Sequence, residues 1–216
     1  MTAPAHAHKD RDWVEIVATV LLSVAAVATA WSSYQAARWN GEQAKTASRN
    51  NGVRVEAARA QGLAEAQTEV DVATFIQWVD ATVHDDTDLA DFYEERFRDE
   101  FKPAFEAWVA TDPLTTAGSP PTPFAMDEYK LEATEEAEAL DAESAELSEQ
   151  LRRNIQRSTN YMLGVVLFAV SLFFAGISTK IQGRGSRIAL LVVGTTLFFG
   201  TAAWIATSPI SVAINP

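Results

Sequence analysis

Three long apolar blocks constrain the fold of this 216-residue chain more than any other feature. They run over residues 13–33, 161–178 and 188–207. Each block is close to the about 20 residues that a helix needs to cross about 30 Å of hydrocarbon. Because a backbone in lipid has to satisfy its polar groups internally, the blocks are predicted to be transmembrane helices. Trp13, Trp31, Tyr161 and Trp204 lie near block ends, as aromatic residues do at a membrane–water boundary.

The order of these blocks predicts an all-α integral membrane protein with three transmembrane helices. A helical hairpin between the first and second blocks is expected to form a coiled-coil-like stalk with a small helical cap. The other predicted segments are the N-terminal tail 1–12, the acidic helical extramembrane domain 34–160, the short basic loop 179–187 and the C-terminal tail 208–216. The first block lacks a small-residue cleavage site at its end, so we expect a retained anchor rather than a signal peptide.

Basic residues in the short segments predict the orientation. The N-terminal tail and the short loop contain Lys9, Arg11, Lys180, Arg184 and Arg187. The positive-inside rule places both segments on the cytoplasmic side of the membrane. Residues 34–160 and the C-terminus are then extracytoplasmic. Six basic residues on the domain side oppose this orientation, but long segments count little in the rule.

These six basic residues lie close to the predicted spans, where they are expected to contact lipid headgroups. They are Arg38, Lys45, Arg49, Arg152, Arg153 and Arg157. Attraction to anionic lipid amounts to about 1 kcal/mol per charge near the surface. Between Glu65 and Glu149, by contrast, 24 acidic residues stand against 4 basic ones. This distal part is expected to stay in water, and a solvated charged surface accounts for the same pattern.

The composition excludes several classes of function. A net charge of −12 argues against a nucleic-acid partner, which requires a basic surface. The chain contains no cysteine, so disulfides, thiolate nucleophiles and cysteine-based zinc sites are excluded. No serine lies in a Gly-x-Ser-x-Gly elbow, and no carboxylate pair is recognisable as catalytic. We therefore expect a protein that is not an enzyme and has no cofactor.

Helical periodicity continues through the middle domain. One seam of small residues and leucines recurs at spacings of three and four, as in a coiled coil. It comprises Ala133, Ala137, Leu140, Ser144, Leu147, Leu151 and Ile155. No helix breaker precedes Tyr161, so this helix is expected to continue into the second span. The first span should likewise extend to about Val83, since single glycines weaken a helix without ending it.

The distal end of the domain is aromatic. Its helically spaced aromatic residues are predicted to form a small helical cap with its own core. In one alternative for the function, this cap binds a protein partner. They are Phe92, Tyr93, Phe97, Phe101, Phe105 and Trp108. Pro103 is expected to kink this helix or to begin a new one. The segment His84-Asp85-Asp86-Thr87-Asp88 has no calcium-loop spacing, and we interpret it as a helix N-cap rather than a metal site.

A face of polar and small side chains runs along the first span. It includes the one acidic residue inside a predicted span. Its members are Glu15, Thr19, Ser23, Ala26 and Ala30. One interpretation is a close helix–helix contact, with Glu15 paired to Lys180, Arg184 or Arg187 at the inner membrane surface. The alternative is a water-lined path, because ionisable groups in membrane helices are often functional. Thr196 and Gly200 in the third span offer a similar contact.

One stretch of sequence supports the same architecture by resemblance. Trp31-Ser-Ser-Tyr-Gln-Ala-Ala-Arg-Trp-Asn-Gly-Glu-Gln-Ala44 resembles a signature of uncharacterised bacterial three-span membrane proteins. Gln77–Ala81, Phe101–Trp108 and Arg152–Arg157 look like further parts of that pattern. The resemblance implies the three-span architecture, and with it a multi-pass chain in the inner (plasma) membrane of a bacterium. It implies no activity or functional residue.

The expected function is therefore assembly or partner binding by a membrane protein that forms homo-oligomers. Self-association would cover the apolar and small-residue faces that a lone three-helix bundle leaves open. The first alternative is an oligomeric ion channel or transport component, with the Glu15 face lining the pore. The second is an envelope sensor or accessory subunit that binds a protein partner through its cap.

Overall fold

The computed structural model describes residues 13–113, 115–116 and 118–211, and the predicted N-terminal tail lies outside these residues. The described part is helical and contains no β-strand. Its elements are α1 (Trp13–Val83), α2 (Thr87–Glu95), α3 (Lys102–Val109), the 3-10 turn η1 (Pro123–Ala125), α4 (Glu132–Ser178) and α5 (Arg184–Ala206). The predicted all-α class is confirmed. Of the described helices, α1, α4 and α5 are long and apolar enough to cross a membrane.

Helix boundaries follow the sequence signals closely. α1 continues through its glycines as one helix of 71 residues, and α4 continues from the acidic domain into the second apolar block. Pro103 lies in the first turn of α3, where its missing N–H leaves no hydrogen bond unmade. α5 begins at Arg184, inside the predicted loop 179–187, so the connection from α4 is shorter than expected.

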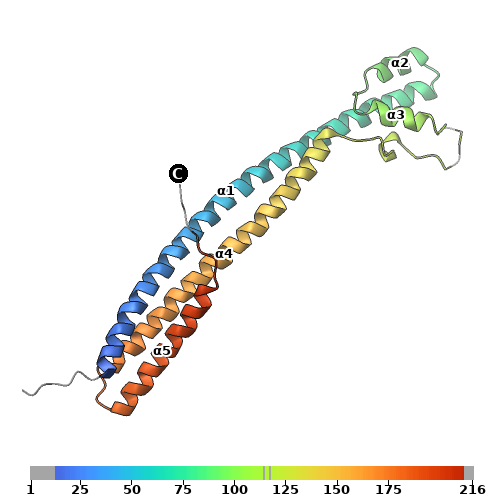
Figure 1. Cartoon of the computed structure of the whole chain (residues 1–216). Helices are drawn as coiled ribbons and strands as arrows, with labels where there is room; N and C mark the ends of the chain where they lie inside the picture. The colour runs from blue at the N-terminus through green and yellow to red at the C-terminus, as the bar shows by residue number, and fades with distance from the viewer. Residues whose placement is uncertain (1–12, 114, 117, 212–216) are drawn as a thin grey trace, which may run out of the picture. The chain divides into compact units, whose positions relative to one another are not determined.

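The chain divides into two compact units. The first, here called the bundle, contains residues up to Ala47 and from Glu149 onward, and the second, the head, contains Ser48–Ser148. In the bundle, α1, α4 and α5 lie side by side (Figure 1). Small and aromatic side chains fill the space between them, including Val14, Ala18, Ala25, Phe168 and Phe198.

Two glycines allow close packing of α4 and α5 in the bundle. A Cβ at Gly194 would lie 3.2 Å from the Ser171 carbonyl oxygen and 3.3 Å from Phe174 Cβ. The Ser171 hydroxyl donates to the Gly194 carbonyl at 2.7 Å. A Cβ at Gly164 would lie 2.8 Å from Ile205 Cδ1. Small residues that bring two backbones together are the usual basis of helix association in membranes.

Buried positions on α4 recur at steps of three and four, and polar residues occupy those that follow Leu151. The predicted seam is buried or half-buried as far as Leu151. It then continues through Asn154, Ser158 and Tyr161, while Ile155 is 41% exposed. The assignment of Ile155 to the seam is therefore wrong. The heptad spacing continues there with hydrogen-bonding side chains in place of apolar ones.

These polar side chains face partners on α1. In the bundle, the Ser158 hydroxyl lies 2.8 Å from Asn40 Oδ1, and Asn154 Nδ2 donates to the Thr46 hydroxyl at 3.3 Å. In the head, Asn50 receives a hydrogen bond from Ser144 at 2.9 Å and donates one to Ser148 at 3.0 Å. The α1–α4 contacts in each unit thus combine small apolar residues with paired polar groups.

The head has an aromatic core beside the C-terminal end of α1, where α2 and α3 pack (Figure 1). The core consists of Phe75, Phe97, Phe101, Phe105 and Trp108, with Phe124 and Tyr129 packed against it. Most ring pairs meet edge to face, as between Trp78 and Phe105 with centroids 4.8 Å apart. The Trp108 indole donates to the Pro120 carbonyl at 2.8 Å, which fixes the chain between α3 and η1 to the core.

Candidate functional site

The predicted polar face of the first span lies on the outside of the bundle. Glu15, Thr19, Ser23, Ala26 and Ala30 are all exposed, while the opposite side of α1 packs on α4 and α5. Among the described residues, Glu15 makes no salt bridge, so the predicted ion pair with the loop is not formed. The Thr19 and Ser23 hydroxyls donate to carbonyls one turn earlier, at 2.8 Å and 3.0 Å.

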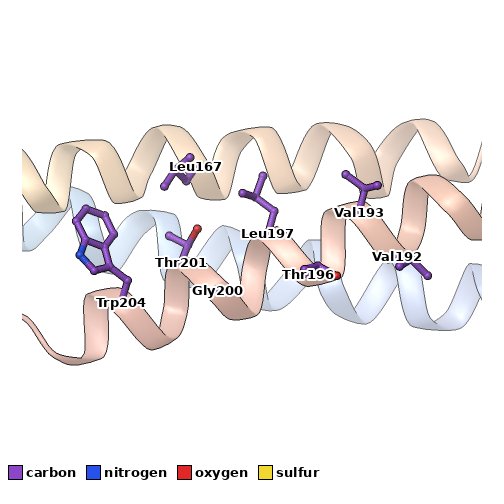
Figure 2. Close-up of a pocket in the computed structure, with 8 residues that line it drawn as sticks. All are labelled: Leu167, Val192, Val193, Thr196, Leu197, Gly200, Thr201 and Trp204. Atoms are coloured by element: carbon purple, nitrogen blue, oxygen red, sulfur yellow. The ribbon is translucent and has the colours of Figure 1, made fainter.

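The outer face of α5 forms a shallow groove with a volume of about 610 Å³. Figure 2 shows its lining, which comes from one residue of α4 and seven of α5: Leu167, Val192, Val193, Thr196, Leu197, Gly200, Thr201 and Trp204. A Cβ at Gly200 would meet nothing within 4 Å. The small residues predicted for a helix contact, Thr196 and Gly200, therefore lie at an open surface rather than inside the bundle.

The chain that follows α5 is tied to the other two helices of the bundle. The Pro209 carbonyl accepts hydrogen bonds from Trp39 Nε1 and from the Tyr161 hydroxyl, both at 3.2 Å. The backbone N–H of Ser211 donates to Gln35 Oε1 at 2.9 Å. Residues 208–211, here called the strap, thus connect the end of α5 to α1 and α4. The exposed Trp31 lines a pocket together with Ser208 and Ile210 of the strap, and the exposed Trp204 lies in the last turn of α5.

Three donors beside the strap lack a hydrogen-bond partner among the described residues. They are the Ser32 hydroxyl, Gln35 Nε2 and Arg38 Nε, and all three atoms are buried. Ser32 is 1% exposed and Gln35 is 0% exposed. Ser32 also lines a pocket of about 250 Å³ between α1, α4, α5 and the strap. Buried donors normally have partners, since leaving one unmet costs about 1–3 kcal/mol.

The six basic residues predicted to contact headgroups are largely engaged with neighbouring side chains. Arg49 pairs with Glu143 at 2.6 Å in the head. In the bundle, Arg152 and Arg153 both pair with Glu149, and Lys45 pairs with Glu42. The Arg157 guanidinium stacks over the Trp39 ring at 4.5 Å. Arg38 makes no salt bridge with a described residue, and its headgroup contact stays a prediction, as do the other five.

The partner-binding cap requires a correction. Phe97, Phe101, Phe105 and Trp108 are buried in the aromatic core of the head, so they offer no surface to a partner. The predicted core of the cap is confirmed, but these four residues form no exposed binding face. Of the six predicted residues, Tyr93 is half-buried and Phe92 is 45% exposed, with the Arg96 guanidinium 3.6 Å above its ring.

The acidic turn before α2 is a helix cap, as predicted. The Asp86 carboxylate accepts a hydrogen bond from the Leu89 N–H at 3.2 Å, which satisfies one of the free donors at the helix start. His84 Nδ1 lies 2.8 Å from the Asp80 carbonyl oxygen. Within the described residues, no group of three or more acidic or histidine side chains is arranged to hold a metal ion.

A buried charge network in the head could not be predicted from sequence spacing. The fully buried Asp71 of α1 accepts hydrogen bonds from Arg98 at 2.8 Å and from the Tyr129 hydroxyl at 3.1 Å. Arg98 also pairs with Glu100, whose carboxylate accepts from the Glu132 N–H at 3.0 Å. Burial raises the pKa of Asp71 and of Tyr129, and for Asp71 the Arg98 charge opposes that shift. The network joins α1, the segment before α3 and the start of α4.

The fold and these surfaces define a helical protein with three candidate membrane-spanning helices. Comparisons with protein-family models, curated proteins and solved structures find no match to the chain. The resemblance to bacterial three-span proteins therefore stays a prediction.

Proposed function

We propose that this chain is a non-enzymatic integral membrane protein that acts through self-assembly in the bilayer. The observation that carries the proposal is the open groove on α5, where Thr196 and Gly200 face away from the chain's own core. In lipid, no hydrophobic effect drives helices together, so association depends on close packing at small residues. A groove of this kind admits the ridge of a neighbouring helix more closely than lipid chains fill it.

The exposed face of α1 supports the same proposal. Ala26 and Ala30 present small side chains to the outside, and Glu15 presents a carboxylate there. An ionisable group on the outer face of a membrane helix is costly, and a second chain relieves that cost by giving it a polar partner or an interface. Thr19 and Ser23 already donate to their own backbone, so they fit a close contact without needing further partners.

In this proposal the bundle inserts into the inner membrane of a bacterium, with the N-terminus in the cytoplasm. The acidic head and the C-terminus then lie outside the cytoplasm, and paired α1 and α4 form a coiled-coil-like stalk. The spacing of buried residues supports that stalk, because positions 137, 140, 144, 147, 151 and 154 of α4 are buried or half-buried. Resistance of the chain to carbonate extraction tests the insertion, and its release by carbonate contradicts it.

The mass of the particle in lipid nanodiscs or mild detergent tests the assembly. Light scattering is expected to give several times the 23.5 kDa of one chain. Gly200→Leu fills the groove and should lower that mass. Ala203→Leu is the matched control, since Ala203 is exposed on α5 and does not line the groove. A monomer for the wild-type chain, or equal masses for both variants, contradicts the proposal.

The two alternatives predict different results. Because the Glu15 face lies outside the bundle, a pore lined by it needs several copies arranged around that face. Conductance in reconstituted bilayers that Glu15→Gln changes would favour the channel over simple assembly. A sensor or accessory subunit would instead give a reproducible second protein on crosslinking in native membranes.

A further inference from the structure

We propose that the pocket beneath the strap binds a membrane phospholipid and that the Ser32 hydroxyl donates a hydrogen bond to an ester carbonyl of that lipid. The inference rests on the proposed insertion of the bundle into a bilayer. It assigns a specific lipid site to a position where the sequence indicated only general attraction to headgroups.

Buried hydrogen-bond donors lack acceptors beside the strap. The unpartnered atoms of Ser32, Gln35 and Arg38 are all donors, and they lie on one helix at steps of three residues. The orientation of the Gln35 amide is fixed, because its Oε1 accepts from the Ser211 N–H. The nitrogens of Gln35 and Arg38 can only donate, and the Ser32 hydroxyl can donate, so acceptors satisfy all three atoms. Ester carbonyls and phosphate oxygens of phospholipids are acceptors only.

The shape and lining of the pocket fit part of one lipid. Apolar side chains of all three helices form its wall, including Ala28, Phe168 and Ile205. Trp31 and Ile210 at its edge are exposed, so the pocket opens at the bundle surface. Ser32 supplies a buried donor within this apolar lining. A volume of about 250 Å³ suits the ester group and first carbons of one acyl chain rather than a whole lipid.

In the proposed membrane, the pocket lies at the depth of the lipid esters. Trp31 and Trp204 mark the aromatic belt, which lies at the boundary between hydrocarbon and headgroups. The glycerol esters of a phospholipid occupy the same level. Arg38 lies six residues beyond Ser32, about 9 Å further along the helix at 1.5 Å per residue. Its side chain is thus on the water side of the ester, where the lipid phosphate lies.

The test compares two phospholipids that differ only in the proposed acceptor. The full-length chain is purified in detergent, stripped of lipid and titrated with a diacyl phosphatidylglycerol or with its dialkyl ether, which has no ester carbonyl. Native mass spectrometry counts the lipids bound to each chain. The diacyl lipid is expected to bind about 3- to 10-fold more tightly than the ether, as one hydrogen bond predicts. Equal affinity for the two lipids overturns the proposal and leaves water as the acceptor for Ser32.

Two pairs of variants locate the site. Ser32→Ala should lose the preference for the diacyl lipid, whereas Ser33→Ala should keep it, because Ser33 is exposed on the neighbouring face. Ala206→Trp should block the pocket that Ala206 lines, and Ala203→Trp should not. The second pair still tests the site if Ser32→Ala does not fold. The proposal is overturned if Ser32→Ala or Ala206→Trp, once folded, binds the two lipids as its control does.

The same preparations separate this inference from the proposed function. Release of the wild-type chain by carbonate would contradict insertion, and the lipid site would fall with it. A chain that resists carbonate but binds both lipids equally would contradict the lipid site alone.

Discussion

Gly194 and Gly200 lie six residues apart on α5, and the same substitution at each should have opposite consequences. At Gly194 a Cβ would lie 3.2 Å from the Ser171 carbonyl oxygen and 3.4 Å from the Ala175 backbone nitrogen. Backbone atoms cannot rotate away, so α5 has to move from α4 by a few tenths of an ångström. At Gly200 a Cβ would meet nothing within 4 Å.

The expected free energies of unfolding follow from these distances. Gly194→Ala combines an overpacking cost of about 1–3 kcal/mol with a gain in helix propensity of about 1 kcal/mol. The net effect is a loss of up to about 2 kcal/mol. Gly194→Val adds two further methyl groups at the contact and should cost about 3 kcal/mol or more. Gly200→Ala has only the propensity gain and should stabilise the chain by up to about 1 kcal/mol.

Thermal unfolding of detergent-solubilised protein, followed by the loss of the folded peak in size-exclusion chromatography, measures these differences. For a chain of this length, 1 kcal/mol corresponds to about 2–4 °C in apparent Tm. Gly194→Val should therefore lower the apparent Tm by about 6 °C or more. Gly200→Val should lower it only by as much as assembly stabilises the chain. The hydrogen bond from Ser171 to Gly194, 2.7 Å long, is lengthened in the same step, which adds to the difference.

Light scattering on the same samples completes the comparison. Gly200→Val should reduce the particle mass without lowering the stability of the single chain, because it acts on the outer groove. Gly194→Val should mainly lower the apparent Tm, because it acts on the contact between α4 and α5. If both valine variants have the same apparent Tm, the close approach of α4 and α5 at Gly194 does not hold, and the reasoning is refuted.

Three further predictions concern the head. Asp71→Asn should remove a pH dependence of stability. The pKa of Asp71 is raised by burial, so the folded head binds its proton more tightly than the unfolded chain does. The stability of wild type relative to Asp71→Asn should therefore increase as pH falls through that pKa and decline as pH rises. A pH-independent difference in urea unfolding would contradict this. Asp86→Ala should cost about 1 kcal/mol of cap energy and speed amide exchange in α2, where no residue is buried; unchanged exchange would argue against the cap. Phe101→Ala should destabilise the head by about 3–5 kcal/mol, whereas Phe92→Ala should cost about 1 kcal/mol through its contact with Arg96, and equal losses would contradict the assigned core.

The helices were predictable from sequence because their signals are long and local. Three apolar blocks of span length identify α5 and the apolar parts of α1 and α4. The absence of a breaker before Tyr161 predicted that α4 continues into its span, which it does. Pro103 and Asp86 marked helix starts by their own backbone and side-chain chemistry.

The faces and contacts were harder to predict, because they depend on residues far apart in sequence. The stripe from Glu15 to Ala30 is recognisable on one helix, but its outward direction depends on how α4 and α5 pack. The aromatic spacing in the head is the same for a binding face and for a core, and only burial distinguishes the two. Asp71 and Arg98 are separated by 27 residues, and no local pattern links them.

The polar contacts between α1 and α4 explain why Asn154 is buried in the seam while Ile155 is exposed. Apolar residues alone continue the seam from Leu151 to Ile155, a step of four. The buried face takes a step of three instead and continues at Asn154, which is 3% exposed. In a long helical pair, buried polar residues contribute little net stability, but they penalise any register that leaves them unpaired. A shift of α4 by one heptad would separate Asn154 from Thr46 and Ser158 from Asn40, which leaves buried groups of both helices without partners. These residues therefore select one register among several that the small apolar residues alone would allow, and this register places Tyr161 against the strap.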